Sequence, residues 1–212
     1  MKPDSIILDI DGTLWNSTPI VAEAWNKALE ADPSIAFRFT PQGLTKLFGH
    51  PMSEIADLSF PFLPEKERYA LMDTCCELEH DYLYASTQNL LYPGVADTIR
   101  KLSKTCPLFI VSNCQSGYIE LFLEKTGLGG CITDFECPGG TGMGKGPNIR
   151  LVMERNHLKS PVYVGDIEGD RAASKEAGIP FCHAAYGFGA VTDPDYVIRQ
   201  FSDLLTLFTY SA

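Results

Sequence analysis

The chain has 212 residues, of which 45% are hydrophobic and 21% are charged, and its formal net charge is -10 at pH 7. These values are typical of a globular protein with one domain, or with one domain and an inserted lobe, and they argue against extended disorder. The negative charge repels phosphate backbones, so a nucleic-acid partner is not expected. No stretch reaches the roughly 20 apolar residues of a membrane-spanning helix, so we expect no membrane association.

The first five residues lead directly into an apolar segment and do not have the pattern of a signal peptide. The seven cysteines are scattered along the chain, and none forms the CxxC pair that is typical of zinc and redox motifs. We therefore expect a cytoplasmic protein with reduced thiols. The sequence does not determine the oligomeric state, and a monomer is the default expectation.

The first predicted element is a strand over residues 6–10, because four of these five residues are apolar. Three helices are predicted next, over residues 21–29 with Ser17 or Thr18 as the N-cap, from Thr40 onward, and over residues 64–85. Residues 15–89 show no strand pattern. We therefore expect an all-helical insertion directly after the first strand.

Strands and helices alternate in the rest of the chain. Strands are predicted over residues 107–111, 161–164 and 179–182, the last of the chain, and a short apolar segment lies at residues 131–137. The helices between them are predicted over residues 95–104, 116–126, 147–156 and 171–177. This order predicts an α/β fold with a doubly wound parallel sheet, a Rossmann-like core. We assign this core to residues 1–14 and 90–212, and an all-helical cap domain to residues 15–89.

Polar side chains follow three of the predicted strands, and a lysine ends a Gly-rich loop. These residues are Asp9 and Asp11, then Ser112 and Asn113, then Lys145, and then Asp166 and Asp170. The carboxyl ends of parallel strands meet at one edge of a sheet, so we expect these side chains to converge. Neighbouring carboxylates repel each other unless a cation such as Mg²⁺ lies between them. Taken singly, each group is also consistent with an ordinary turn or a solvated loop lysine.

The order of these residues resembles the haloacid dehalogenase superfamily, in particular its phosphoglycolate-phosphatase-like members with a helical cap after the first strand. The resemblance covers nearly the whole chain. It rests on the DxDGT motif that begins at Asp9, on Ser112, on Lys145 and on the GDIEGD motif that begins at Gly165. The motif has Asn16 and Ser17 where the family often has Asp and Ser.

The resemblance implies a role for each residue. Asp9 would be the nucleophile that forms an aspartyl-phosphate, and Asp11 would be the acid and base for the leaving oxygen and for water. The cofactor would be Mg²⁺, bound by Asp9, the carbonyl of Asp11 and Asp166, while Thr13 and Asp170 would support these ligands. Three residues would bind the phosphate group: Ser112, Asn113 and Lys145.

The inserted helices would close over this site and contact the substrate. Candidates for that contact, by their position in the chain, are Trp15, Asn16, Trp25 and the turn formed by Gly49, His50 and Pro51. Two alternatives stay open, because tryptophans also fill the cores of helical domains and a histidine in a loop is often structural or simply exposed.

The segment from Gly139 to Lys145 fits the GxxxxGK pattern of a nucleotide-binding P-loop. The next position of that motif is a Ser or Thr that binds Mg²⁺, but here it is Gly146. We therefore interpret this segment as a flexible approach that brings Lys145 to the site.

The function that these expectations favour is a Mg²⁺-dependent phosphatase, which hydrolyses a small phosphorylated metabolite through an aspartyl-phosphate on Asp9. A phosphomutase similar to beta-phosphoglucomutase would use the same residues, and a phosphorylatable regulatory domain without catalytic activity is a third possibility. A dehalogenase is disfavoured, because relatives with that chemistry lack the second aspartate, which is Asp11 here. The sequence does not identify the substrate.

Overall fold

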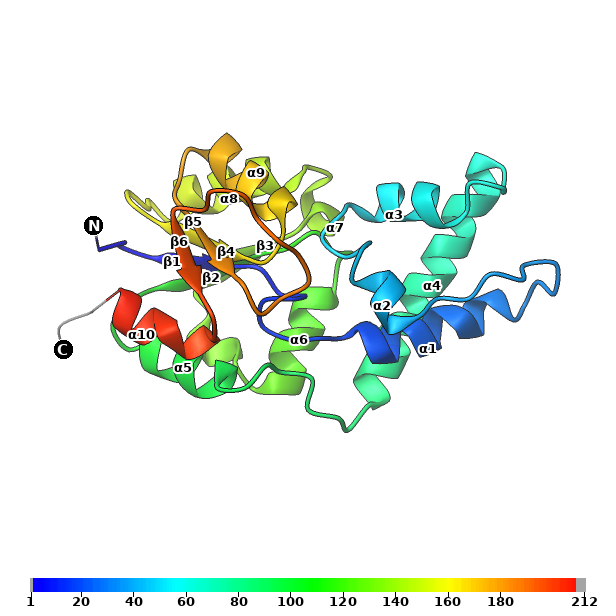
Figure 1. Cartoon of the computed structure of the whole chain (residues 1–212), viewed down its shortest axis with the longest axis horizontal. Coiled ribbons are helices and arrows are strands. Elements are labelled where there is room, and N and C mark those ends of the chain that lie inside the picture. Colours follow the sequence, from blue (N-terminus) through cyan, green and yellow to red (C-terminus); the bar gives the residue numbers. More distant parts are fainter. Residues whose placement is uncertain (1, 209–212) are drawn as a thin grey trace.

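The computed structural model describes residues 2–208 of the chain. Six parallel strands form one sheet in the order β3-β2-β1-β4-β5-β6 (Figure 1). The strands are β1 (Ile6–Leu8), β2 (Leu108–Val111), β3 (Asp134–Glu136), β4 (Val162–Gly165), β5 (Phe181–Ala184) and β6 (Tyr196–Ile198). The predicted α/β fold with a parallel sheet is confirmed.

β1 lies inside the sheet and is buried on both faces. Ile6, Ile7 and Leu8 are each 0% exposed. Since side chains alternate along a strand, Ile6 and Leu8 join one hydrophobic cluster and Ile7 joins a second cluster on the other face. The apolar run at the start of the chain therefore has no solvent-exposed face, as is typical of a parallel sheet.

Helices cover both faces of this sheet (Figure 1). One face carries α5 (Val95–Leu102), α6 (Tyr118–Thr126) and α10 (Leu204–Leu207), and the other carries α8 (Lys145–Arg155) and α9 (Glu168–Ala177). Three short segments complete this part of the fold: α7 (Pro138–Thr141) and the 3-10 turns η1 (Gly129–Cys131) and η2 (Phe201–Asp203). The doubly wound arrangement is confirmed.

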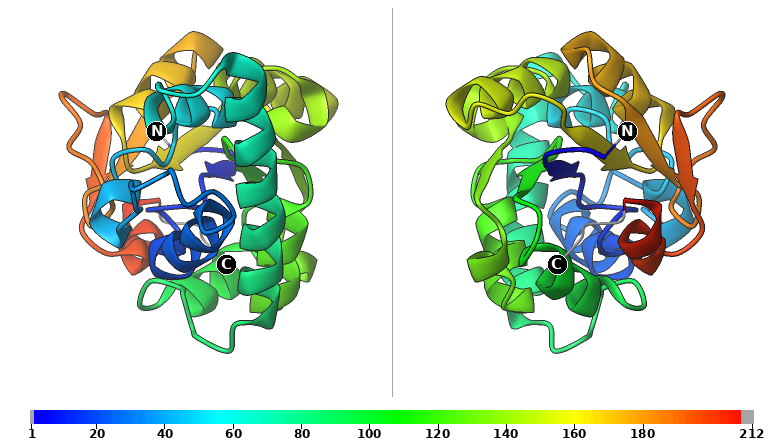
Figure 2. Two further views of the ribbon diagram at one scale, coloured as in Figure 1. Left: turned by 90° about the vertical axis from the view of Figure 1, so that its right-hand side faces the viewer. Right: turned by 90° about the vertical axis from the view of Figure 1, so that its left-hand side faces the viewer.

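Residues 15–89 hold four helices and no strand of the sheet, and we call this segment the helical insertion. Its helices are α1 (Thr18–Leu29), α2 (Pro41–Leu44), α3 (Met52–Ser59) and α4 (Glu65–Ala85). The insertion lies at the end of the molecule toward which β1 runs, with α4 beside α1 (Figure 1, Figure 2). Trp25 of α1 is 1% exposed and lies edge-on to Phe39, with 5.0 Å between the ring centroids. The division of the chain into a core domain and a cap domain remains a prediction.

The predicted end of the sheet is wrong. The strand expected over residues 179–182 is β5 (Phe181–Ala184), and it is not the last strand, since β6 follows at the edge of the sheet. β6 has only three residues, and Val197 at its centre is 50% exposed. Its apolar run is limited to these three residues, and backbone pairing with β5 maintains the strand, so the sequence pattern alone did not predict it.

Two helices begin earlier than predicted, and three helices were not predicted. α8 starts at Lys145, whose side chain is held by ion pairs, and α9 starts at Glu168. The Asp170 side chain accepts a hydrogen bond from the backbone N–H of Ile167, which caps the start of α9. The unpredicted helices are α3 in the insertion and the four-residue helices α7 and α10. Among residues 2–208, no helix is both long and apolar enough to cross a lipid bilayer.

Candidate active site

The register of the sheet brings the predicted site residues to one edge. Leu8, the last residue of β1, lies level with its partners in β2 and β4. Asp9, Ser112 and Asp166 follow the ends of these three neighbouring strands. The chain order of the strands reverses around β1, and such a point at the carboxyl edge of a sheet is where ligands bind in doubly wound folds.

Three buried carboxylates and one lysine form the centre of the site. Oxygen atoms of Asp9, Asp166 and Asp170 lie within 4.8 Å of one another, and each residue is at most 2% exposed. Lys145 Nζ lies 2.9 Å from Asp9 Oδ1 and 2.5 Å from Asp170 Oδ1. The structure thus brings together residues that are up to 161 positions apart in the chain, as the difference between 9 and 170 shows.

The charge of this cluster fits a divalent cation. Three ionised carboxylates and one ammonium group leave two negative charges without a counter-charge in a buried space. Burial, and then the negative charges of Asp170 and Asp9, raise the pKa of Asp166 well above its ordinary value. A cation among these oxygens removes that repulsion, and Mg²⁺ prefers oxygen ligands. The donor set therefore fits the metal that the sequence predicts.

Backbone geometry holds Asp166 close to the end of β1. Gly12 has φ +81°, and a Cβ atom at this position would collide with the Asp166 carboxylate. The backbone N–H of Phe188 donates to Asp166 Oδ2 at 2.6 Å, and Thr13 Oγ1 lies 3.5 Å from Asp166 Oδ1. Asp170 Oδ2 accepts a hydrogen bond from the backbone N–H of Asp166 at 2.9 Å. Thr13 and Asp170 therefore lie directly around Asp166.

Asp11 is not part of the carboxylate cluster and has three hydrogen-bond donors of its own. Its Oδ1 atom accepts from Trp15 Nε1 at 3.0 Å, from Ser17 Oγ at 2.5 Å and from Tyr118 OH at 2.9 Å. Burial raises the pKa of Asp11 to about 7, although the hydrogen bonds from Ser17 and Tyr118 lower it. A carboxyl group with this pKa exchanges a proton near neutral pH, which suits general acid–base chemistry.

The helical insertion meets the strand ends across a small cavity of about 20 Å³. The sheet side of this cavity, which we call the active-site cavity, includes Asp9, Asp11, Ser112 and Asn113. The insertion contributes Trp25, Phe48, Gly49, Met52, Ile55 and Glu79. Asn113 Nδ2 donates to the carbonyl of Gly49 at 2.7 Å, so the side-chain amide that the sequence assigned to phosphate binding joins the two parts of the molecule.

Two of the insertion residues that the sequence singled out line the active-site cavity. They are Trp25 and Gly49. Trp15 is 2% exposed and donates to Asp11, so it contacts a site residue from outside the cavity. Asn16 accepts a hydrogen bond at the start of α1, and His50 makes a half-exposed contact with a carboxylate of the insertion.

Sequence reasoning missed several residues of the site. Tyr118 and Ser17 hold Asp11, and Gln115 Nε2 donates to Glu79 Oε1 at 3.1 Å. Ser17 stands where the family pattern has a Ser, whereas Tyr118, Gln115 and Glu79 belong to no motif, although Glu79 has a signal in the sequence. It is a carboxyl group at a helical spacing from apolar residues of α4, where the pattern predicts a core position.

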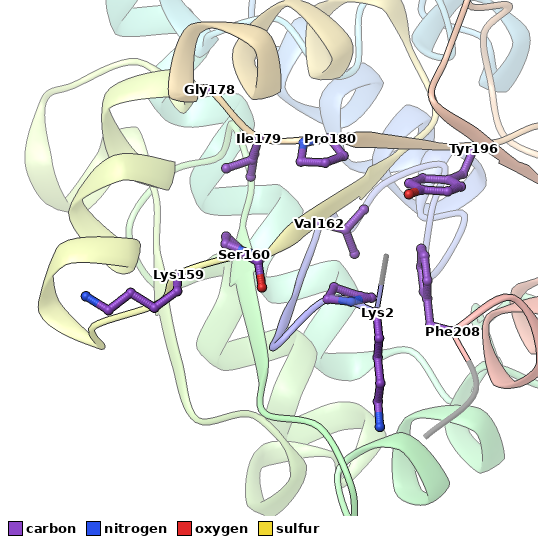
Figure 3. A pocket seen from close by; sticks show the side chains of 11 residues that line it. Lys2, Lys159, Ser160, Val162, Gly178, Ile179, Pro180, Tyr196 and Phe208 are labelled. Carbon is purple, nitrogen blue, oxygen red and sulfur yellow. The ribbon is translucent and has the colours of Figure 1, made fainter. Parts of the chain in front are cut away.

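A second hollow, of about 220 Å³, lies at the opposite edge of the sheet (Figure 3). Ser160 and Val162 line it where β4 begins, and Ile179 and Pro180 line it just before β5. Its lining contains no Asp, Glu, His or Cys among the described residues. This hollow therefore has neither an aspartate that could act as the nucleophile nor a side chain of the usual metal-binding types.

Comparison with known proteins agrees with this geometry. The model of a family described as haloacid dehalogenase-like hydrolase matches residues 6–184. This chain belongs to that family. The match extends from β1 to β5 and includes every motif residue that carried the resemblance. The resemblance is therefore confirmed, and the protein is a hydrolase of this family.

Relatives match over nearly the full length of the chain. A phosphoglycolate phosphatase of Vibrio parahaemolyticus is 27% identical over 226 residues, which covers 98% of this chain and 96% of the relative. A phosphoglycolate phosphatase of Rhodobacter capsulatus is 28% identical, and the alignment covers 87% of this chain and 85% of the relative. The structure of a predicted phosphoglycolate phosphatase from Haemophilus somnus has a TM-score of 0.83 at 20% identity, with 98% of both chains covered. This structural likeness shows the fold.

Proposed function

We propose that this haloacid dehalogenase-like hydrolase cleaves a small phosphate monoester with Mg²⁺ as its cofactor, through a covalent aspartyl-phosphate on Asp9. The observation that carries the proposal is the buried cluster of three carboxylates and Lys145, with Asp11 two residues after the nucleophile. The names of the relatives support a phosphatase and make phosphoglycolate one of the esters to test.

In this proposal Mg²⁺ is held by Asp9, Asp166 and the backbone carbonyl of Asp11, with Asp170 beside them. When bound, the cation neutralises the two excess negative charges and lets an anionic phosphate approach an anionic nucleophile, an effect worth several kcal/mol. Ser112, the backbone near Asn113 and Lys145 donate to the phosphate oxygens. The ammonium group of Lys145 remains close to Asp9, at 2.9 Å from Oδ1, and so stabilises the charge that develops there.

The first step transfers the phosphoryl group to Asp9. An oxygen of the Asp9 carboxylate attacks phosphorus, and the bond between phosphorus and the ester oxygen breaks. Asp11 gives its proton to that leaving oxygen, so the alcohol departs as a neutral molecule. The three donors on Asp11 Oδ1 hold the carboxyl group in one orientation, which is what proton transfer at a defined atom requires.

The second step returns the enzyme to its starting state. Asp11, now ionised, takes a proton from a water molecule, whose oxygen attacks the phosphorus of the aspartyl-phosphate. The bond between phosphorus and Asp9 breaks, and inorganic phosphate leaves. The helical insertion acts as a cap in this scheme, because it covers the strand ends and limits the water that reaches them.

The proposal is tested by phosphate release from p-nitrophenyl phosphate, phosphoglycolate, sugar phosphates and nucleotides, with Mg²⁺ and with EDTA. We expect release that requires Mg²⁺ and that Asp9→Asn abolishes, because the amide keeps the shape of the side chain but is not a nucleophile. Asp11→Asn should slow hydrolysis of the aspartyl-phosphate, so this intermediate should accumulate. Mass spectrometry detects it as a phosphorylated chain. Conversion of a sugar phosphate to an isomer without phosphate release would indicate a mutase. Phosphorylation of Asp9 without any turnover would indicate a regulatory domain, and either result would overturn the proposal.

A further inference from the structure

Glu79 is a buried carboxyl group without a counter-charge. It is 3% exposed, and it forms no ion pair with a Lys, Arg or His among residues 2–208. Its Oε2 accepts from Trp25 Nε1 at 2.7 Å, and its Oε1 accepts from Gln115 Nε2 at 3.1 Å. Burial raises its pKa to about 8, although the hydrogen bonds lower it. Buried carboxyl groups normally have a counter-charge, and this one, which has none among the described residues, lines the active-site cavity.

The active-site cavity offers hydrogen-bond acceptors and aromatic rings, but no positive charge. None of the described residues that line it is Lys, Arg or His. Asn113 Nδ2 is used by Gly49, and Asn113 Oδ1 is buried without a hydrogen-bond partner among the described residues. Trp25 and Glu79 lie on the insertion side of the same cavity. An ammonium group has three donors and no acceptor, and aromatic faces attract it, so it complements this lining.

A larger hollow of about 730 Å³ adjoins the active-site cavity, and its lining also favours positively charged ligands. The two share three lining residues: Met52, Gln115 and Tyr118. The outer hollow also has three acidic residues of α4, which are Asp73, Glu77 and Asp81, against a single His80. A concave surface lined by one sign of charge concentrates ligands of the opposite sign, so the approach favours cations over anions.

The small volume of the active-site cavity limits the leaving group. A cavity of about 20 Å³ holds roughly one water molecule, which is also the size of an ammonium group. A sugar ring would displace the insertion much further from the sheet than a chain of two or three carbons would. Return of the insertion to the sheet after substrate entry therefore favours a short leaving group with a compact polar end.

We propose, on the basis of the phosphatase function above, that the substrate is the phosphate ester of a small amino alcohol and that Glu79 binds its ammonium group. Asn113 Oδ1 and the ring of Trp25 complete the contact. The chemistry is unchanged: the ester bond to phosphorus breaks, Asp11 protonates the leaving oxygen, and the amino alcohol departs before water releases phosphate. An ammonium group bound here would favour the ionised form of Glu79, whereas the carboxylate of phosphoglycolate would find no counter-charge among the described residues of this lining.

Three esters with two-carbon leaving groups test this proposal, since they differ mainly in charge. Phosphoethanolamine carries an ammonium group, hydroxyethyl phosphate is neutral at that end, and phosphoglycolate carries a carboxylate. With Mg²⁺ at neutral pH, we expect kcat/KM for phosphoethanolamine to exceed that for phosphoglycolate by at least about tenfold, with hydroxyethyl phosphate between them. Equal values, or a preference for phosphoglycolate, overturn the proposal.

Glu79→Gln tests the assigned residue, because the amide keeps the side-chain shape and removes the charge. We expect kcat/KM for phosphoethanolamine to fall by about tenfold, while hydroxyethyl phosphate changes by less than about threefold. Glu67→Gln is the matched control, since Glu67 is an exposed residue of the same helix outside both hollows. A preference for phosphoethanolamine that survives in Glu79→Gln overturns the assignment.

Two further measurements separate this proposal from the phosphatase function on which it rests. Hydrolysis of hydroxyethyl phosphate reports phosphatase activity without an ammonium group and with a leaving group of the same length. If none of the three esters is hydrolysed, the phosphatase function is overturned, whereas hydrolysis without the charge preference overturns only the selectivity. Calorimetry with Asp9→Asn measures binding without turnover. We expect tighter binding of phosphoethanolamine than of phosphoglycolate, and the reverse order contradicts the proposal.

Discussion

Asp166, in its ionised form, carries a negative charge that no ion pair within the described residues neutralises. Its Oδ2 accepts a hydrogen bond from Phe188, while the one ammonium group of the cluster, that of Lys145, is bound to Asp9 and Asp170. Repulsion among the three carboxylates therefore opposes folding until a cation binds. Binding of Mg²⁺ to the folded protein then adds its own free energy to the free energy of unfolding.

We expect Mg²⁺ to raise the melting temperature of the wild-type protein, because a ligand at one hundred times its Kd stabilises the folded state by about 2.7 kcal/mol. Asp166→Asn removes one ligand and one charge, so its melting temperature in EDTA should be higher than that of the wild type, and Mg²⁺ should no longer raise it. Thermal denaturation with EDTA and with Mg²⁺ measures both effects. The control is Asp97→Asn, an exposed change on α5, which should respond like the wild type. A full Mg²⁺ response in Asp166→Asn would contradict the metal assignment.

The residues of the carboxylate cluster were accessible from sequence because each follows a strand or begins a helix. Asp9 and Asp166 directly follow β1 and β4, and the parallel register brings such positions together. The contacts of the insertion were not accessible in this way. Trp15 and Asn16 follow the first motif in the chain, and His50 lies in a turn of the insertion, but tertiary packing determines which side chains reach the active-site cavity, and these do not.

At the scale of elements, helix α4 is unusual because a carboxyl group interrupts its buried face. The other buried residues of α4 are Met72, Cys75 and Leu83, and Glu79 lies four residues after Cys75 and four before Leu83. Burial raises the pKa of Glu79 from 4.5 to about 8. At a pH between these values, the unfolded chain has lost the proton that the folded protein keeps. The free energy of unfolding therefore falls as pH rises through this window, by up to about 1.4 kcal/mol per pH unit.

Glu79→Gln should remove this dependence, because an amide does not titrate. We expect the variant to gain stability relative to the wild type as pH rises from about 5 to about 8, by a few kcal/mol in total. Urea denaturation at several pH values measures the difference in the free energy of unfolding between the two proteins. The contributions of groups that titrate in both proteins cancel in this difference. In Glu67→Gln, the exposed control on the same helix, the difference should stay near zero. A constant difference for Glu79→Gln across this range would contradict the raised pKa.

The elements themselves were largely predictable, because their patterns are local. The long run without Gly or Pro gave α4 almost to the residue, at Glu65–Ala85. β6 and α3 were missed for different reasons. β6 is a three-residue edge strand that depends on backbone pairing with β5, and α3 is a short helix whose stability comes from packing against α4. Such elements depend on neighbours that are distant in the chain.

At the scale of the whole molecule, the closeness of the helical insertion to the sheet decides access to the site. Asn113 donates to Gly49, and Phe48 lies 6.3 Å from Phe188 between ring centroids, so contacts from both parts hold the insertion over the strand ends. The active-site cavity between them has only about 20 Å³. A phosphate ester is larger than this space, so the insertion must move away from the sheet to admit the substrate and then return.

Gly49 is the position where this closed arrangement is most sensitive to a small change. It has φ +93°, and a Cβ atom here would collide with the side chain of Ile167 on the sheet side. Gly49→Ala should therefore disfavour the closed arrangement by about 1–2 kcal/mol, raising KM and lowering kcat, and small-angle scattering should show a larger radius of gyration. Gly130→Ala is the control, since its Cβ meets nothing within 4 Å. Because Gly49 supplies only backbone atoms, unchanged kinetics and scattering in Gly49→Ala would mean that catalysis does not require this closure.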